Sequence, residues 1–229
     1  MKAAASWSGG KDSCLAYYKA LKGFEVSHLL NFVSKDGMCM SHGIDGKLIA
    51  AQSQATGIPI VQKETTWETY EESFKDAVRG LRRTGVEAVV FGDLRTIPGH
   101  EGWIDRVCSG LDIKPIKPLW GSDPKHVLKE FIDDGFEAVV ISAKADLLGK
   151  EWLGRRINKD FVRNICREKP KVDPCGELGE YHTLVLDGPL FKNRIKILES
   201  GKFLKNGYWF LKISGYEIME KGVKNEENV

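Results

Sequence analysis

The chain has 229 residues, with 34 Lys and Arg against 32 Asp and Glu, and 42% of its residues are hydrophobic. This length supports one large domain or two modest ones with enough core to fold unaided, which excludes a small disulfide-stapled scaffold. The formal charge of +2 gives no general attraction for a polyanion such as duplex DNA, so we do not expect nucleic acid as a partner.

Three further patterns concern the compartment. The chain contains no run of about 18 apolar residues, so we expect no membrane-spanning helix and no membrane partner. The N-terminal stretch MKAAASWSGGKDS is too short in apolar residues for a secretory signal. The 5 cysteines are scattered without a C-x-x-C pair, which is typical of free thiols in a reducing compartment. We therefore expect a cytoplasmic protein.

The first two-thirds of the chain repeats one unit, in which a helical pattern, a Gly and a short apolar run follow one another. Gly23, Gly57, Gly85 and Gly135 stand where helices would end in the left-handed conformation. The runs that follow are apolar on both faces, as buried parallel strands are. This pattern predicts strands at 2–7, 26–32, 59–62 and 88–91, and helices at 11–22, 47–56, 70–83 and 102–111.

The pattern changes after the turn-forming stretch PLWGSDP at 118–124, which we interpret as a linker. Beyond it we expect helices at 124–134 and 159–168, strands at 138–142, 183–188, 194–200 and 208–214, and a frayed polar tail at 220–229. The sequence thus predicts an α/β domain at 1–121 and a smaller mixed α+β domain at 122–229.

The most informative segment is Ser8-Gly9-Gly10-Lys11-Asp12-Ser13, between the first predicted strand and the first predicted helix. A Gly-Gly turn at the carboxyl end of a parallel strand lets the backbone approach a ligand closely, and the following helix N-terminus favours an anion such as phosphate. The segment matches neither G-x-x-x-x-G-K-[ST] nor G-x-G-x-x-G. The alternative is an ordinary strand-to-helix turn, with Ser8 near an N-cap position and Asp12 complementing the helix dipole.

SGGKDS after an N-terminal strand resembles the PP-loop ATP pyrophosphatases, which split ATP into AMP and pyrophosphate. The resemblance implies a Rossmann-like parallel sheet of the HUP, or adenine nucleotide alpha hydrolase-like, type. It also implies that ATP and Mg²⁺ are the cofactors. In this interpretation Lys11 neutralises the pyrophosphate, Asp12 helps to place the metal, and the phosphate contacts come from Ser8, Gly9, Gly10 and Ser13.

Later segments narrow the resemblance to the diphthine–ammonia ligase family. They are VVFGDL at 89–94, GWIDRVCSGLDIKPIKPLW at 102–120 and DPCGELGEYHTLVLDGPLF at 173–191. This family converts the carboxylate of diphthine on translation elongation factor 2 into an amide with ATP and ammonium, so the resemblance implies these two as partners. The expected motif G-E-G-G-E-Y has Leu178 in place of its middle Gly. If a positive φ were needed there, the loop would differ.

The chemistry of that family suggests roles for the GELGEYH loop. Glu177 and Glu180 are candidates for binding ammonium, accepting its proton or pairing with the trimethylammonium of diphthine. Tyr181 is a candidate for covering that cation, and His182 for carrying a proton. The alternative is that the two glutamates are solvated surface charges and that His182 only begins the next strand.

The nucleotide base and ribose are expected in the crevice beside the first strand, where Asn31, His42 and Gly92 are candidate contacts. Asp93 follows the fourth strand at the same edge, so we expect it to hold the metal together with Asp12.

These observations favour an ATP-dependent amide ligase that works through an acyl-adenylate. Two alternatives stay open. One is an RNA-modifying adenylating PP-loop enzyme, which would need a basic face, and the other is a non-catalytic ATP-binding signalling module. The sequence does not decide the oligomeric state, and a homodimer is one option.

Overall fold

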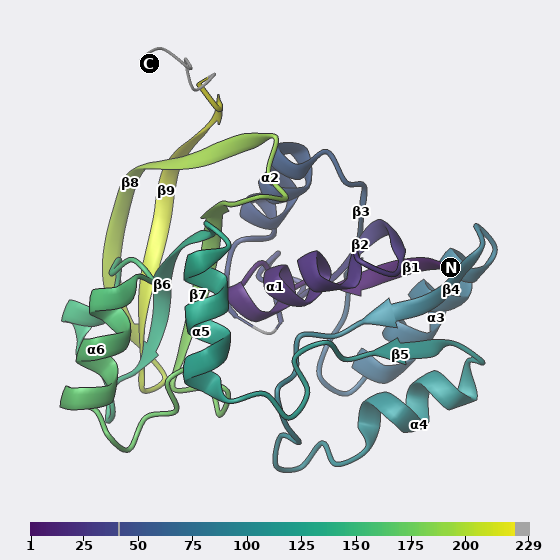
Figure 1. The fold of residues 1–229 in the computed structure, drawn as a ribbon, viewed down its shortest axis with the longest axis horizontal. Helices are drawn as coiled ribbons and strands as arrows, with labels where there is room; N and C mark the ends of the chain where they lie inside the picture. Colours follow the sequence, from purple (N-terminus) through teal and green to yellow (C-terminus); the bar gives the residue numbers. More distant parts are fainter. Residues whose placement is uncertain (41, 223–229) are drawn as a thin grey trace.

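A computed structural model describes residues 1–40 and 42–222. Within them, one sheet is parallel and has the strand order β3-β2-β1-β4-β5 (Figure 1). Its strands are β1 (Lys2–Ser6), β2 (Glu25–Val33), β3 (Ile60–Glu64), β4 (Val86–Val90) and β5 (Lys114–Ile116). This order is the Rossmann-like one. Strands β2 and β3 are added on one side of β1 and strands β4 and β5 on the other, which leaves a crevice at the carboxyl ends of β1 and β4. The predicted fold class is confirmed.

Helices cover both faces of this sheet because the strand residues alternate between them. Ala4 faces the side packed by α3 (Tyr70–Arg82) and α4 (Trp103–Gly110), whereas Ala3 and Ala5 face the side packed by α1 (Lys11–Ala20) and α2 (Gly46–Thr56). The helix predicted at 70–83 is confirmed as α3, and it is amphipathic, with Phe74, Ala77, Val78 and Leu81 as its buried residues.

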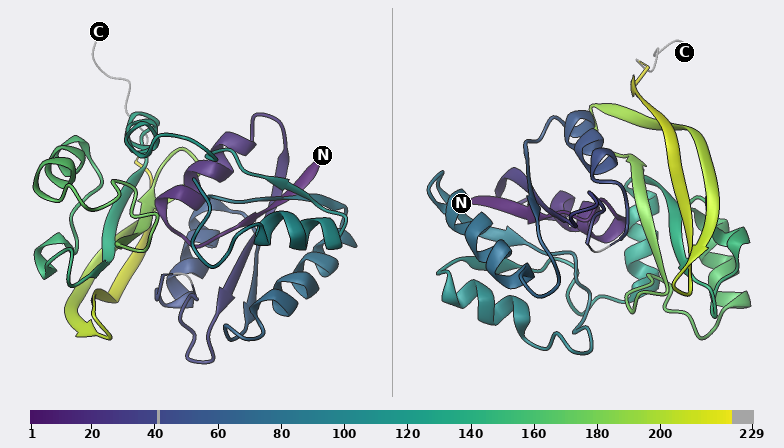
Figure 2. Two further views of the ribbon diagram at one scale, coloured as in Figure 1. Left: turned by 90° about the horizontal axis from the view of Figure 1, so that it is seen from below. Right: turned by 180° about the vertical axis from the view of Figure 1, so that it is seen from behind.

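A second sheet is antiparallel and has the order β7-β6-β9-β8. Its strands are β6 (Glu137–Lys144), β7 (Tyr181–Asp187), β8 (Asn193–Lys205) and β9 (Tyr208–Glu220). It is accompanied by α5 (Pro124–Asp133), the short 3-10 helix η1 (Lys150–Trp152) and α6 (Lys159–Glu168). Figure 2 shows this sheet beside the parallel one, with α1 between them in the left-hand view.

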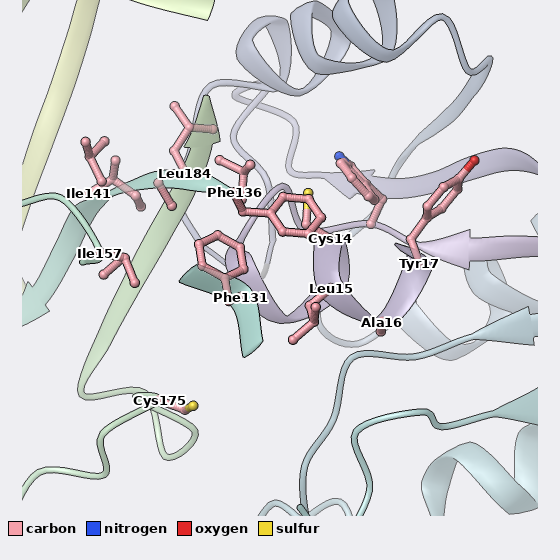
Figure 3. Close-up of a cluster of buried hydrophobic side chains, with 14 of the residues drawn as sticks. Cys14, Leu15, Ala16, Tyr17, Phe131, Phe136, Ile141, Ile157, Cys175 and Leu184 are labelled. Atoms are coloured by element: carbon pink, nitrogen blue, oxygen red, sulfur yellow. The ribbon is translucent and has the colours of Figure 1, made fainter. Parts of the chain in front are cut away.

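One hydrophobic core joins the two sheets. Leu15 and Tyr17 on α1 belong to the same buried cluster as Phe131 on α5 and Leu184 on β7. Figure 3 shows Phe131 and Phe136 between α1 and the side chains of the second sheet, and the centroids of their stacked rings lie 5.0 Å apart. Lys19 on α1 also pairs with Glu130 on α5 at 2.5 Å. The parallel sheet therefore packs against the second half of the chain through α1.

The element pattern departs from the sequence prediction in a few places. Strand β5 was not predicted, because it is three residues long and Pro115 at its centre cannot donate to a ladder, which suits the edge position it takes. Strands β8 and β9 extend beyond their predicted ends as a long hairpin. Gly57, Gly85 and Gly135 have positive φ as predicted, but Gly23 does not. Positions 223–229 of the tail expected to fray lie outside the described residues.

Candidate functional site

A cavity of about 720 Å³ lies at the carboxyl edge of the parallel sheet. Its lining includes the loop after β1 with the start of α1, the loop after β4, and the 175–183 segment that leads into β7. Both halves of the chain thus contribute to one cavity. We refer to Ser8–Ser13 as the phosphate-type loop. It meets the GELGEYH loop (176–182) in the cavity, where Lys11 donates a hydrogen bond to the carbonyl of Cys175, 164 residues away in the sequence.

The phosphate-type loop is shaped by glycine and held by its surroundings. Gly9 has φ +80°, and Gly10 precedes α1 without any side-chain cap, so the helix N-terminus opens toward the cavity. The Gly9 carbonyl accepts hydrogen bonds from Gln52 Nε2 at 2.9 Å and from the Val185 N–H at 3.0 Å. Ser8 and Ser13 hydroxyls bond each other at 3.1 Å. The loop geometry is therefore fixed by α2 and β7 as well as by its own residues.

Gln52 is the central brace of this arrangement. It is fully buried on α2, and its Nε2 also donates to the Val185 carbonyl at 2.8 Å. Its Oε1 accepts from Trp7 Nε1 at 2.9 Å. On the other side of the loop, Thr183 Oγ1 accepts from the Lys11 N–H at 3.0 Å. Neither contact was predicted from the sequence: Gln52 lies in no recognisable motif, and Thr183 was expected only as the start of a strand.

Lys11 and Asp12 form a pair at the start of α1. The Lys11 ammonium is 3% exposed, lies 2.7 Å from Asp12 Oδ2 and donates to the Cys175 carbonyl. Burial acts to lower the pKa of Lys11, but Asp12 and the neighbouring groups outweigh it and raise that pKa. Asp12 Oδ1 is buried and has no hydrogen-bond partner among the described residues. Lys11 is thus a permanent cation, and Asp12 has one oxygen available for a ligand.

Two more carboxylates line the same cavity. Burial and the nearby charge of Asp12 raise the pKa of Asp93. The same causes, with Asp93 added, raise the pKa of Glu177 to about 7. Glu177 Oε1 accepts a hydrogen bond from the Leu94 N–H at 2.9 Å, which joins the GELGEYH loop to the loop after β4. The sequence assigns Asp93 to the metal and Glu177 to ammonium or the substrate, and both carboxylates line the cavity that Asp12 also lines.

Glu180 and Tyr181 both have partners within the protein. Glu180 is 5% exposed, does not line the cavity, and accepts from the N–H groups of Asp173 at 3.0 Å and Leu178 at 2.9 Å. It is thereby engaged in holding the loop. Tyr181 is 1% exposed and the Lys11 ammonium lies 5.2 Å from its ring centroid. Lys11 therefore lies over the ring that the sequence suggested for a substrate cation, and a contact of Tyr181 with that cation stays a prediction.

His182 stacks on His42, with ring centroids 4.4 Å apart and planes at 26°. Burial, followed by the charge of Lys11, lowers the pKa of His182 to about 4. Burial also lowers the pKa of His42, whose Nδ1 has no hydrogen-bond partner among residues 1–40 and 42–222. His42 lies against the phosphate-type loop, since a Cβ on Gly10 would stand 2.6 Å from His42 Cε1. Both histidines are therefore neutral at neutral pH.

Asn31 and Gly92 shape the cavity wall. Asn31 is 2% exposed, and its amide bonds the Trp7 carbonyl at 2.8 Å, Cys39 Sγ at 3.2 Å and Gln62 Nε2 at 3.1 Å. Its hydrogen bonds are thus directed to the protein. A Cβ on Gly92 would lie 2.8 Å from backbone atoms of Asp12 and Ser13, so only glycine lets β4 end this close to α1.

Leu178 does not strain the loop. Gly176 and Gly179 take positive φ values of 69° and 83°, whereas Leu178 is not among the residues with positive φ. A glycine is therefore not required at position 178. The Leu178 side chain is 55% exposed and lines the cavity.

Comparison with known families gives a clear result. Residues 1–115 match the diphthamide synthase N-terminal domain, and residues 123–224 match the diphthamide synthase C-terminal domain. The chain belongs to the diphthamide synthase family. The two matched ranges each contribute one wall of the cavity described above.

Several curated relatives of this diphthamide synthase family member are named diphthine–ammonia ligase. The chain is 26% identical over 252 residues to the diphthine–ammonia ligase of Rattus norvegicus, covering 96% of this chain and 94% of that protein. It is 25% identical over 246 residues to the Homo sapiens diphthine–ammonia ligase, covering 96% and 91%. It is 28% identical over 221 residues to the Schizosaccharomyces pombe diphthine–ammonia ligase. That match covers 87% of this chain, which spans only 36% of the length of the yeast protein.

A solved structure also resembles the chain. It is described as a predicted subunit of tRNA methyltransferase from Methanocaldococcus jannaschii, and it matches with a TM-score of 0.46 and 15% sequence identity over 82% of this chain and 98% of that one. The fold assignment of this diphthamide synthase family member rests on its own strand order. Among its described residues, no helix combines the length and apolarity needed to cross a bilayer.

Proposed function

We propose that this protein is an ATP-dependent amide ligase that converts the carboxylate of diphthine into the amide of diphthamide, with ammonium as the nitrogen donor. The observation that carries the proposal is the hydrogen bond within one cavity from Lys11, in the phosphate-type loop, to the carbonyl of Cys175, the residue just before the GELGEYH loop. This juxtaposition would bring the phosphates of ATP beside the carboxylate Glu177. The family membership and the curated relatives support the same activity.

In the proposed reaction, a carboxylate oxygen of diphthine attacks the α-phosphorus of ATP. The bond between the α-phosphorus and the bridging oxygen breaks, which releases pyrophosphate and leaves an acyl-adenylate. Ammonia then attacks the acyl carbon, and AMP leaves with the former carboxylate oxygen. Lys11 and the N-terminus of α1 would stabilise the pyrophosphate, with contacts from the Ser8 and Ser13 hydroxyls.

The nitrogen loses two protons between ammonium and amide, so a proton acceptor is needed. Glu177, with a pKa of about 7, is poised between carboxylate and acid near neutral pH, which suits a general base. His182, whose pKa is lowered to about 4, stays neutral near neutral pH and is a weaker proton acceptor than Glu177.

A magnesium ion fits this site by its donor chemistry. Asp12 Oδ1 is a buried oxygen without a partner among the described residues, and Asp93 lines the same cavity. No group of three or more His, Cys, Asp or Glu side chains in the described part of the chain is arranged to hold a metal. Mg²⁺ usually takes only one or two carboxylates and completes its shell with phosphates and water. Asp12 and Asp93 would hold it, and it would neutralise phosphate charge.

Several wider assignments belong to the same proposal. The protein substrate would be translation elongation factor 2 bearing diphthine, and the reaction would take place in the cytoplasm. Residues 1–121 would form the ATP-binding domain and residues 122–229 the substrate domain. Asn31, His42 and Gly92 would lie beside the base and ribose.

The test is AMP release from purified protein given ATP, magnesium and ammonium, with and without the diphthine-bearing factor. The proposal predicts AMP only when both ammonium and the factor are present. Lys11→Met should abolish it while the circular dichroism spectrum is retained, whereas Lys22→Met, at an exposed position, should have no effect. AMP release stimulated by tRNA would instead support an RNA-modifying enzyme. ATP binding without turnover would support a signalling module.

A further inference from the structure

Three aromatic rings form one wall of the cavity at its mouth. Trp67, in the turn before α3, is 64% exposed although it is the largest side-chain type. Its ring centroid lies 5.9 Å from that of Tyr70, which lies 5.8 Å from that of Trp103. All three line the cavity. We refer to Trp67, Tyr70 and Trp103 as the aromatic wall. Because the indole of Trp67 is exposed beside a cavity, the wall is a candidate binding surface.

The carboxylate of Glu71 fixes the orientation of Trp103 in the aromatic wall. Trp103 Nε1 donates to Glu71 Oε2 at 3.1 Å, and Arg106 grips Glu71 with two hydrogen bonds of 2.9 and 2.7 Å. A hydrogen bond from the indole N–H to a carboxylate makes the ring more electron-rich, since linked hydrogen bonds polarise one another. The wall is thus both rigid and suited to a cation on its open face.

The charges around the cavity favour a positive ligand. Among the described residues, the Lys and Arg side chains that line it are all in ion pairs: Lys11 with Asp12, Arg95 with Asp173, and Lys117 with Asp105.

Three lining carboxylates are in no ion pair within the described part of the chain: Glu68, Asp93 and Glu177. Glu68 is the neighbour of Trp67, so an unpaired negative charge stands at the exposed end of the wall.

The molecule already holds a cation on an indole at this cavity. Lys117 Nζ lies 4.6 Å from the ring centroid of Trp120, and both residues line the cavity. The ring of Tyr181, by contrast, is taken by Lys11. A substrate cation therefore has the aromatic wall as its open aromatic face.

We propose that the aromatic wall, with Glu68, is a subsite for a quaternary ammonium group. Resting on the proposed function, this subsite receives the trimethylammonium of diphthine, while the diphthine carboxylate points to the phosphate-type loop. A quaternary ammonium has no N–H to donate and is weakly hydrated, so aromatic faces and an unpaired carboxylate hold it better than hydrogen-bond acceptors do.

The first experiment needs no turnover. The indole N–H resonances of ¹⁵N-tryptophan-labelled protein are followed by NMR while choline chloride is added at constant ionic strength. Choline should shift the Trp67 resonance, and 3,3-dimethylbutan-1-ol, which has the same shape without the charge, should bind about tenfold more weakly. Trp67→Leu should remove choline binding and Trp67→Phe should retain it. Glu68→Gln should weaken it, whereas Glu72→Gln, outside the cavity lining, should not.

The second experiment separates this subsite from the proposed function. Trp67→Leu should raise KM for the diphthine-bearing factor about tenfold with little change in kcat or in the Kd of ATP. Choline binding without any AMP formation would leave the subsite standing and overturn the proposed function. Equal binding of choline and the neutral alcohol would overturn the subsite. So would a loss of ATP affinity in Trp67→Leu without choline binding, because the wall would then be a platform for the nucleotide base.

Discussion

The backbone N–H of Lys11 donates a 3.0 Å hydrogen bond to Thr183 Oγ1, so the first helix of the parallel sheet is anchored on β7 of the antiparallel sheet. A second connection comes from Gln52 on α2, whose Nε2 donates hydrogen bonds of 2.9 Å to the Gly9 carbonyl and 2.8 Å to the Val185 carbonyl. The phosphate-type loop is therefore positioned by elements that lie outside its own motif.

The first prediction concerns Gln52. Gln52→Met would leave Trp7 Nε1 and the Val185 carbonyl without partners in a buried place, which should destabilise the protein by about 2–4 kcal/mol. It should also raise KM for ATP, because the Gly9 carbonyl loses one of its two donors. Gln54→Met, at an exposed position of the same helix, should change stability by less than about 0.5 kcal/mol. Urea unfolding and ATP titration check both, and equal effects of the two changes would contradict the bracing role.

A second prediction concerns Gly92. Its Cβ in Gly92→Ala would stand 2.8 Å from backbone atoms of Asp12 and Ser13, which cannot yield as a side chain can. We expect a loss of about 1–3 kcal/mol in stability and weaker ATP binding, since the start of α1 must shift. Gly80→Ala in α3 meets nothing within 4 Å and should stabilise the helix by about 0.4–1 kcal/mol. Calorimetry of the two variants measures this difference in sign, and a stable, ATP-binding Gly92→Ala would refute the packing argument.

The third prediction concerns Glu177. Glu177→Gln keeps an oxygen for the Leu94 N–H, so the loop and ATP binding should be retained. Removal of the carboxylate should lower acceptor-dependent AMP formation by about 10²-fold or more, the size expected for a general base. Isothermal titration with ATP and an AMP assay with the factor measure the two effects separately. Loss of ATP binding with turnover per bound ATP unchanged would show that the assigned role is wrong.

A fourth prediction concerns pH and the His42–His182 stack. The pKa of His182 is about 4 in the folded protein, below its ordinary value of 6.5, and that of His42 is also lowered. The neutral stack therefore contributes stability above about pH 6.5 that is lost as pH falls toward 4. His182→Phe should flatten part of this slope in urea unfolding between pH 7 and pH 4.5. His126→Phe, at an exposed position on α5, should leave the slope as it is, and an unchanged slope in His182→Phe would contradict the assignment.

Much of the parallel sheet could be predicted because its signals are local. Buried apolar runs, helical spacing and turn glycines each occupy a few neighbouring residues, and the alternation of strands with helices predicts a parallel sheet. Strand β5 was missed because Lys114–Ile116 is too short to show a period. The full length of the β8–β9 hairpin was missed because much of it is exposed and alternates weakly between apolar and polar residues.

In the candidate site, too, local signals could be predicted from the sequence and contacts between distant elements could not. Ser8 to Ser13 could be found from the sequence because a motif in one loop carries the chemistry. The role of Gln52 could not, since its three contacts depend on which elements meet after folding. Glu180 and Tyr181 were placed at the substrate because glutamate and tyrosine suit a cation. Their actual contacts with backbone N–H groups and with Lys11 depend on the path of the loop.

The shared core between the two sheets has a consequence for how the chain can be divided. A cut between positions 115 and 123 would separate Leu15 and Tyr17 from Phe131 and Leu184, and would expose apolar surface on both fragments. Each piece expressed alone should aggregate or stay incompletely folded, while the two pieces produced together should recover by complementation. The intact chain should accordingly melt in one cooperative transition rather than in two.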